Sequence, residues 1–199
     1  MTSTVIIIPS RLKAKRLPGK PLKLIKGKEI ILHVYNLAVK SGAGEVLVTT
    51  PDKTISELID NNGGKSFISK ESHETGTDRV FEAFKNFYSS EPKIIINLQG
   101  DMPNLDHNSI LLLSDYLNKG LCDVATLASS LKNKSEIEDK NVVKVFTNNN
   151  IEKSGFSEAL DFKRVVDQTK NKFIYHHIGI YGFTSKALIR YVNLKRSKL

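Results

Sequence analysis

Hydrophobic and polar positions along the chain form two kinds of pattern, one typical of strands and one typical of helices. Short apolar runs predict buried strands over residues 4–8, 45–50, 65–69, 93–98 and 123–128. Segments with apolar residues at helical spacing predict helices over residues 29–41, 53–61, 77–88 and 108–118. Strands and helices therefore follow one another from residue 4 to about residue 128.

A succession of this kind predicts an α/β fold, in which helices flank both faces of an open, mostly parallel sheet in a Rossmann-like arrangement. Ligand sites in such sheets lie at the carboxyl ends of the strands. Beyond about residue 130 the pattern changes, and apolar runs predict strands over residues 142–146, 151–156 and 174–183. We therefore predict a single domain over residues 1–199, with a β-rich insert over about residues 130–183.

Composition narrows the class of protein. The 199 residues are 40% hydrophobic, which is enough for one packed core. Cys122 is the only cysteine, so an internal disulfide is impossible and the reducing cytoplasm is the expected location. No apolar run reaches the length of a membrane span, and we predict a soluble protein without a membrane partner.

Positive charge is concentrated at the beginning of the chain. The formal net charge is +9, and residues 1–28 contain eight Lys and Arg but no Asp or Glu. Such a segment could bind nucleic acid, bind a small polyanion such as a nucleoside triphosphate, or form a solvated basic face. Residues 9–28 contain no aromatic side chain on which bases could stack, which disfavours a nucleic-acid partner.

Three polar segments follow predicted strands and are candidates for one binding site. In the first loop, residues 9–21, cations could converge on phosphates where Gly19 lets the backbone approach. Asp101 follows an apolar strand, where it could bind Mg²⁺ or cap a turn. In residues 73–79, Thr77 could cap the following helix, and Arg79 could meet an external anion or a surface carboxylate.

Four motifs occur in order along these segments. They are Ile-Pro-Ser-Arg at 8–11, Arg-Leu-Pro-Gly-Lys-Pro-Leu at 16–22, His-x-x-Gly-Thr-Asp-Arg at 73–79 and Gln-Gly-Asp-x-Pro at 99–103. Together they resemble the 3-deoxy-D-manno-octulosonate (Kdo) cytidylyltransferases of lipopolysaccharide biosynthesis. Further matches at 141–145, 177–182 and 191–193 extend the resemblance over the whole chain.

The resemblance implies a nucleotide-diphospho-sugar transferase-like fold, a homodimer, and the Mg²⁺-dependent reaction of CTP with Kdo, an acidic 2-keto sugar, to give CMP-Kdo and diphosphate. The residues that it implies for nucleotide binding are Ser10, Arg11, Arg16, Lys20, Gly76, Thr77 and Arg79. Those implied to be catalytic are Arg11, Arg16, Lys20 and Asp101, of which Asp101 would also bind the metal. Those implied to contact the sugar are Gln99, His177 and Tyr181.

Departures from the family pattern leave alternatives open. Met102 replaces an acidic residue, and Glu158 stands where the family has an arginine that would meet the acidic sugar. The family's chains also continue further, so we expect this chain to be C-terminally incomplete and to lack a second metal-binding aspartate. The alternatives are a CMP-sugar synthetase for another acidic sugar, such as an amino-substituted octulosonate or a sialic-acid relative, and a non-catalytic nucleotide-binding fragment.

Overall fold

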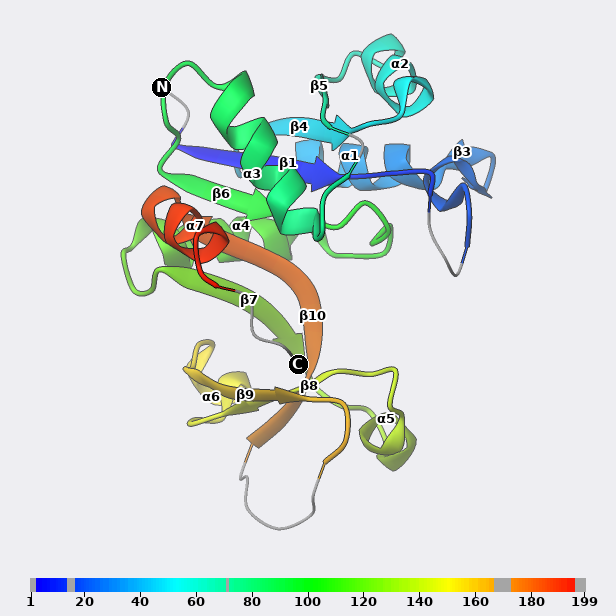
Figure 1. Ribbon diagram of the computed structural model, residues 1–199. Helices are drawn as coiled ribbons and strands as arrows, with labels where there is room; N and C mark the ends of the chain where they lie inside the picture. Colours follow the sequence, from blue (N-terminus) through cyan, green and yellow to red (C-terminus); the bar gives the residue numbers. More distant parts are fainter. Residues whose placement is uncertain (1–2, 14–16, 71, 167–172, 196–199) are drawn as a thin grey trace. The chain divides into compact units, whose positions relative to one another are not determined.

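The structure, a computed structural model, describes residues 3–13, 17–70, 72–166 and 173–195 (Figure 1). The chain divides into two compact units. The first comprises Met1–Ala125 and Ile180–Leu199, and the second comprises Thr126–Gly179. Strand β10 (Phe173–Thr184) contributes residues to both units.

The first unit is built on a mixed sheet in the strand order β5-β4-β1-β6-β10. The parallel strands are β1 (Thr4–Pro9), β4 (Glu45–Thr50), β5 (Ser66–Ile68) and β6 (Ile94–Asn97), whereas β10 pairs antiparallel with β6. This arrangement confirms the predicted open, mostly parallel sheet. Because Pro9 pairs with Thr49 and Ile7 with Asn97, the carboxyl ends of β1, β4 and β6 meet at one edge.

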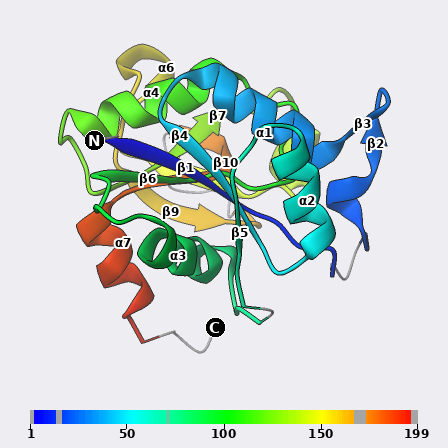
Figure 2. The same cartoon turned by 90° about the horizontal axis from the view of Figure 1, so that it is seen from above.

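Helices cover both faces of this sheet (Figure 2). One face carries α1 (Ile30–Ser41), α2 (Lys53–Asn61) and α4 (His107–Asn118), and the other carries α3 (Gly76–Phe87) and α7 (Ser185–Val192). The 3₁₀ turn η1 (Lys20–Leu22) and the short strands β2 (Leu24–Ile25) and β3 (Lys28–Glu29) precede α1. Among the described residues, no helix has the length and apolar character that a membrane span requires.

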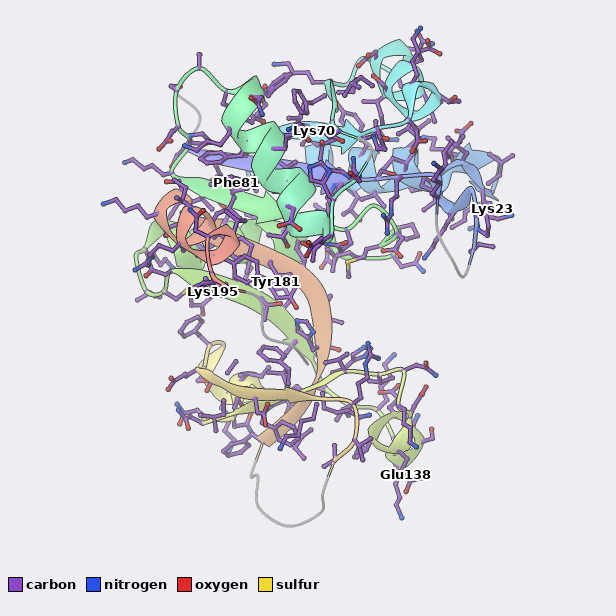
Figure 3. The ribbon with its side chains drawn as sticks, viewed as in Figure 1. Lys23, Lys70, Phe81, Glu138, Tyr181 and Lys195 are labelled. Atoms are coloured by element: carbon purple, nitrogen blue, oxygen red, sulfur yellow. The ribbon has the colours of Figure 1, made fainter. Side chains whose placement is uncertain are left out.

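Strand β1 shows why apolar runs in this sequence are uninterrupted. Val5 and Ile7 belong to a buried cluster, against which Phe81 of α3 and Tyr181 of β10 pack (Figure 3). Ile6 points to the opposite side of the strand and is also fully buried. A fully buried aliphatic side chain contributes about 1.5–3 kcal/mol, so β1 is stabilised by packing on both of its faces.

Gly44 precedes β4 at a close approach to β1. A Cβ atom at this position would lie 2.1 Å from the carbonyl oxygen of Thr4, which is a backbone atom and cannot rotate away. Gly44→Ala is therefore expected to lower the free energy of unfolding by about 1–3 kcal/mol, the usual cost of overpacking. The midpoint of urea unfolding measures this loss of stability. Gly179→Ala is the control, because nothing lies within 4 Å of the atom that it adds. Equal midpoints for the two variants would contradict the close approach.

The second unit is smaller and rich in strands. β8 (Lys144–Thr147) pairs antiparallel with residues 173–176 of β10 on one side and with β9 (Ala159–Lys163) on the other. β7 (Val124–Ser129) also pairs with β10. The helices α5 (Lys134–Glu138) and α6 (Ile151–Ser154) are short.

The strand that the sequence predicts over residues 151–156 is wrong, because this segment forms helix α6. The Asn150 side chain caps the helix by accepting from the backbone N–H groups of Glu152 and Lys153, and Gly155 ends it with a positive φ of 70°. The segment has one apolar residue in this single helical turn and one just after it, too few for periodicity to distinguish a helix from a strand. Strand β9 was not expected, because its side chains are exposed along its whole length.

Candidate functional site

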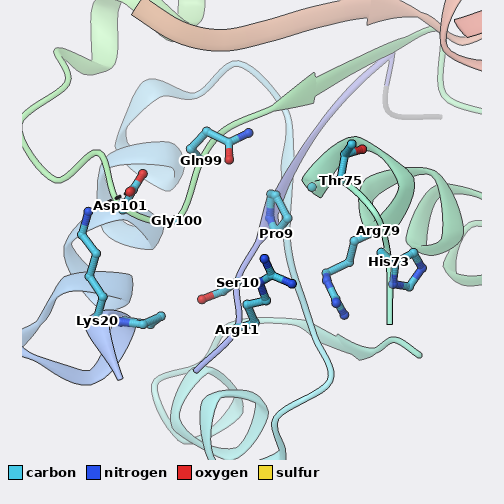
Figure 4. A pocket seen from close by; sticks show the side chains of 12 residues that line it. Pro9, Ser10, Arg11, Lys20, His73, Thr75, Arg79, Gln99, Gly100 and Asp101 are labelled. Atoms are coloured by element: carbon cyan, nitrogen blue, oxygen red, sulfur yellow. Dashed lines mark hydrogen bonds and ion pairs between the residues drawn. The ribbon is translucent and has the colours of Figure 1, made fainter. Parts of the chain in front are cut away.

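A pocket of about 240 Å³ lies in the first unit, where β1 and β6 end (Figure 4). Its lining comes from three segments, which are residues 9–11 with 20–21, residues 73–79 and residues 99–101. These are the three polar segments that the sequence analysis singled out as one candidate site. The parallel sheet brings them together, because each follows the carboxyl end of a strand.

The first loop is fixed by backbone hydrogen bonds. The Ser10 N–H donates to the Thr49 carbonyl at 2.9 Å, which continues the parallel pairing beyond the end of β1. The Gly19 N–H donates to the Leu12 carbonyl at 2.9 Å and brings the two ends of the loop together. Gly19 has a positive φ of 68°, a conformation that favours glycine.

Of the three cations that the resemblance implied to be catalytic, Arg11 and Lys20 line the pocket. Arg16 lies outside the described residues. Lys20 Nζ donates to Asp101 Oδ2 at 2.7 Å, and the two side chains are 35% and 52% exposed. An exposed pair contributes at most about 1 kcal/mol, so an anion at Lys20 and a cation at Asp101 can separate the two groups at low cost. Within the described part of the chain, Asp101 accepts no backbone hydrogen bond of the kind that a turn cap makes.

Helix α3 begins at Gly76 and is capped by Thr75, so the prediction of Thr77 as the cap is wrong. Thr75 Oγ1 accepts from the Asp78 N–H at 3.3 Å, and Asp78 Oδ2 accepts from the Thr75 N–H at 2.8 Å. This reciprocal capping box needs an acidic residue three positions after the cap, a signal that the sequence contained. Thr77 Oγ1 instead accepts from Asn97 Nδ2 at 3.2 Å, and Thr77 is not part of the pocket lining.

Arg79 is the most buried cation in the lining, with 3% of its surface exposed. Its guanidinium donates to the Lys70 carbonyl at 2.9 Å, which holds it against the loop before α3. Burial lowers the pKa of Arg79 and the positive charge of Arg11 lowers it further, whereas the carboxylates of Glu82 and Asp52 raise it. The pocket thus holds two cations close enough to repel each other, and this favours an anionic ligand.

Glu82 of α3 organises the same loop. Its Oε2 accepts from the Lys70 N–H at 3.0 Å and lies 3.0 Å from His73 Nε2. Burial lowers the pKa of His73 and the charge of Arg79 lowers it further, whereas the carboxylates of Glu82 and Asp78 raise it. Sequence analysis missed Glu82, although its spacing of three residues from Arg79 places both side chains on one face of the helix.

Gln99, predicted to contact the sugar, lines the pocket, and its side chain is held by a hydrogen bond to Asn97. Gln99 Nε2 donates to Asn97 Oδ1 at 3.0 Å, and Asn97 in turn donates to Thr77. Asn97 is 1% exposed, and a polar side chain at the end of an apolar run is a sequence signal by which it could have been identified. The next residue is Gly100, where a Cβ atom would lie 3.1 Å from the Pro9 carbonyl oxygen, so the close approach of the two backbones favours glycine.

The other two residues predicted to contact the sugar lie on β10, and neither is part of the pocket lining. His177 belongs to the second unit, where Nε2 lies 2.9 Å from Thr126 Oγ1 and the ring packs edge-on against Phe162 at a centroid distance of 4.9 Å. Burial is the main cause that lowers the pKa of His177. Tyr181 belongs to the first unit and packs against its core cluster. Of the three predicted sugar contacts, the described pocket contains Gln99.

The chain as a whole is similar in sequence to known cytidylyltransferases. Residues 5–199 match the profile described as Cytidylyltransferase. The 3-deoxy-manno-octulosonate cytidylyltransferase of Thermodesulfovibrio yellowstonii is 36% identical, over 98% of this chain and 81% of the relative. The protein of the same name from Wigglesworthia glossinidia brevipalpis is 38% identical, over 94% of this chain and 78% of the relative.

Solved structures agree with these sequence matches. A CMP:2-keto-3-deoxy-manno-octonic acid synthetase complexed with CTP superposes with a TM-score of 0.85 at 35% identity, covering 98% of this chain and 79% of that one. A 4-diphosphocytidyl-2C-methyl-D-erythritol synthase from Anaerococcus prevotii superposes with a TM-score of 0.62 at 12% identity, covering 98% and 78%. The second likeness shows a shared fold alone.

Proposed function

Because the chain belongs to the 3-deoxy-manno-octulosonate cytidylyltransferase family, we propose that it transfers CMP from CTP to Kdo and releases diphosphate. The observation that carries the proposal is the pocket in which the first loop, residues 73–79 and residues 99–101 meet. A relative that is similar over 98% of this chain has been solved in complex with CTP. The pocket's cations and its position at the strand ends suit a nucleoside triphosphate.

The chemistry requires positioning and charge neutralisation. The anomeric hydroxyl oxygen of the sugar attacks the α-phosphorus of CTP, the bond to the bridging β-phosphate oxygen breaks, diphosphate leaves, and the hydroxyl proton passes to solvent. Arg11, Lys20 and Arg79 would bind the triphosphate and stabilise the charge that develops on the leaving group. Gln99, held by Asn97, would orient the sugar beside them.

We also propose that Mg²⁺ is the cofactor. In nucleotide sites Mg²⁺ takes one or two protein carboxylates together with phosphate oxygens and waters, so a carboxylate at the pocket rim can contribute to such a site. Asp101 offers such a carboxylate, half exposed beside Lys20. When bound, Mg²⁺ would neutralise negative charge on the triphosphate.

Family membership supports three further parts of the proposal: a role in lipopolysaccharide biosynthesis, action in the cytoplasm, and a homodimer. A reducing compartment suits a chain whose single cysteine, Cys122, can form no internal disulfide. The second unit exposes the apolar side chains Leu160, Phe162 and Val165, which a second copy could cover.

The acceptor is tested by diphosphate release from CTP and Mg²⁺ with Kdo, an amino-substituted octulosonate and a sialic acid in parallel. The proposal requires the largest kcat/KM with Kdo. A larger value with another acidic sugar would transfer the same chemistry to a different substrate. Binding of CTP without diphosphate release from any acceptor would favour the non-catalytic alternative.

Lys20→Ala is expected to weaken CTP binding by about 1.5–3 kcal/mol, the range for a hydrogen bond to a charged group. Calorimetric titration with CTP measures this loss. Lys23→Ala is the control, because Lys23 carries the same charge three residues further on and is not part of the pocket lining. The assignment of the first loop to the triphosphate is wrong if both variants bind CTP like the wild type.

A further inference from the structure

Asp52 stands at the start of α2, but its side chain does not cap the helix. Its main-chain carbonyl accepts from the Ile55 and Ser56 N–H groups at 3.0 and 3.2 Å, which begins the helix. Its carboxylate oxygen Oδ2 instead accepts from the Leu12 N–H at 2.8 Å, between residues that are 40 positions apart in the sequence. An aspartate directly before a helix commonly caps it with its side chain, whereas the side chain of Asp52 contacts the first loop.

Leu12 is the point at which the first loop closes. Its carbonyl accepts from the Gly19 N–H at 2.9 Å, while its own N–H is bound by Asp52. Arg11 directly precedes this point, and Lys20 directly follows Gly19. Both cations line the pocket, so the carboxylate of Asp52 holds the loop at a position between them.

We propose that Asp52 is a positioning residue, which holds the Leu12 backbone so that Arg11 and Lys20 stay in place for the β- and γ-phosphates of CTP. This inference rests on the proposed binding of CTP. A carboxylate that acted through its charge alone would weaken the binding of a triphosphate, since it offsets the nearby cations. Positioning and charge therefore have effects of opposite sign on CTP affinity, and substitution separates them.

The test compares Asp52→Ala with Asp52→Asn by calorimetric titration with CTP and with CMP. Asp52→Ala removes the acceptor and is expected to raise the Kd for CTP by about ten- to a hundredfold, with a much smaller change for CMP, which lacks the β- and γ-phosphates. Asp52→Asn keeps an oxygen that can accept from Leu12, so its Kd for CTP is expected to stay close to that of the wild type. Asp60→Ala is the control, because it removes one negative charge from the opposite end of α2.

Three results would overturn the inference: undiminished CTP affinity in Asp52→Ala, equal losses in the alanine and asparagine variants, or equal losses for CTP and CMP. If the alanine variant does not fold, amide hydrogen exchange at Leu12 decides the question in the wild type and Asp52→Asn. Slow exchange in both supports the inference, and fast exchange in the wild type overturns it. A wild-type protein that does not bind CTP would refute the proposed function itself, which is a different outcome from normal CTP binding by Asp52→Ala.

Discussion

Asp101→Asn is expected to lower the turnover of CTP and Kdo at least about a hundredfold, the scale of loss when one preorganised electrostatic group leaves a site. Asparagine keeps the size and an oxygen acceptor of the aspartate but lacks the charge that attracts Mg²⁺. CTP binding without metal should stay near the wild-type value or strengthen, because the group that lies 2.7 Å from Lys20 loses its negative charge. Diphosphate release over a range of Mg²⁺ concentrations measures the loss, and titration with CTP alone measures the binding.

Asp106→Asn is the matched control for this change. Asp106 is an exposed helix cap whose side chain accepts from the Asn108 N–H at 3.0 Å at the start of α4. Asparagine caps about as well as aspartate, so this variant should retain full turnover while losing the same charge. If Asp101→Asn also retained full turnover with the wild-type Mg²⁺ dependence, Asp101 would not be a metal ligand.

Arg79→Lys is expected to weaken CTP binding by about ten- to a hundredfold. Lysine keeps the charge but lacks the planar fork of the guanidinium, which here donates to Ser69 Oγ and to the Lys70 carbonyl. Leaving the buried Ser69 hydroxyl and the partly buried Lys70 carbonyl without this donor should also lower the free energy of unfolding by about 1–3 kcal/mol. Titration with CTP and urea unfolding of the same samples separate the two effects.

Arg190→Lys provides the comparison, because Arg190 pairs with Asp123 at an exposed position, with side chains 68% and 63% exposed. The Arg190→Lys substitution should change the free energy of unfolding by less than about 1 kcal/mol and leave the CTP affinity unaltered. Unchanged CTP affinity in Arg79→Lys would exclude a contact between this guanidinium and the nucleotide.

The sheet and the meeting of the three loops could be predicted because both depend on which strands and helix faces are buried. Strands β1 and β6 are covered on both faces, so their apolar runs are recognisable in the sequence, and parallel pairing then places the segments that follow them at one edge. The basic composition of the first loop then predicted that the pocket would carry positive charge. Arg11 and Lys20 of this loop line the pocket, as does Gln99, which the family resemblance and not the burial pattern implied.

Local sequence does not decide which contact a polar residue makes, or whether a short segment forms a strand or a helical turn. Asp52 stands where an aspartate commonly caps a helix, yet its carboxylate binds Leu12, a contact that depends on the parallel pairing of β1 with β4. Thr75 and Thr77 are both acceptable caps, and Asp78 decides between them through the capping box. The segment that forms α6 is too short for its apolar pattern to distinguish a helical turn from a strand.

The central claim, that this pocket joins CMP to Kdo, is tested most directly by following the phosphorus atoms of CTP. Phosphorus NMR of the protein with CTP, Mg²⁺ and Kdo should show a new CMP phosphodiester signal and free diphosphate appearing in equal amounts. Neither should form when Kdo is omitted or when Asp101→Asn replaces the wild type over the same time. Consumption of CTP without the phosphodiester signal, or persistence of CTP with all components present, would contradict the account.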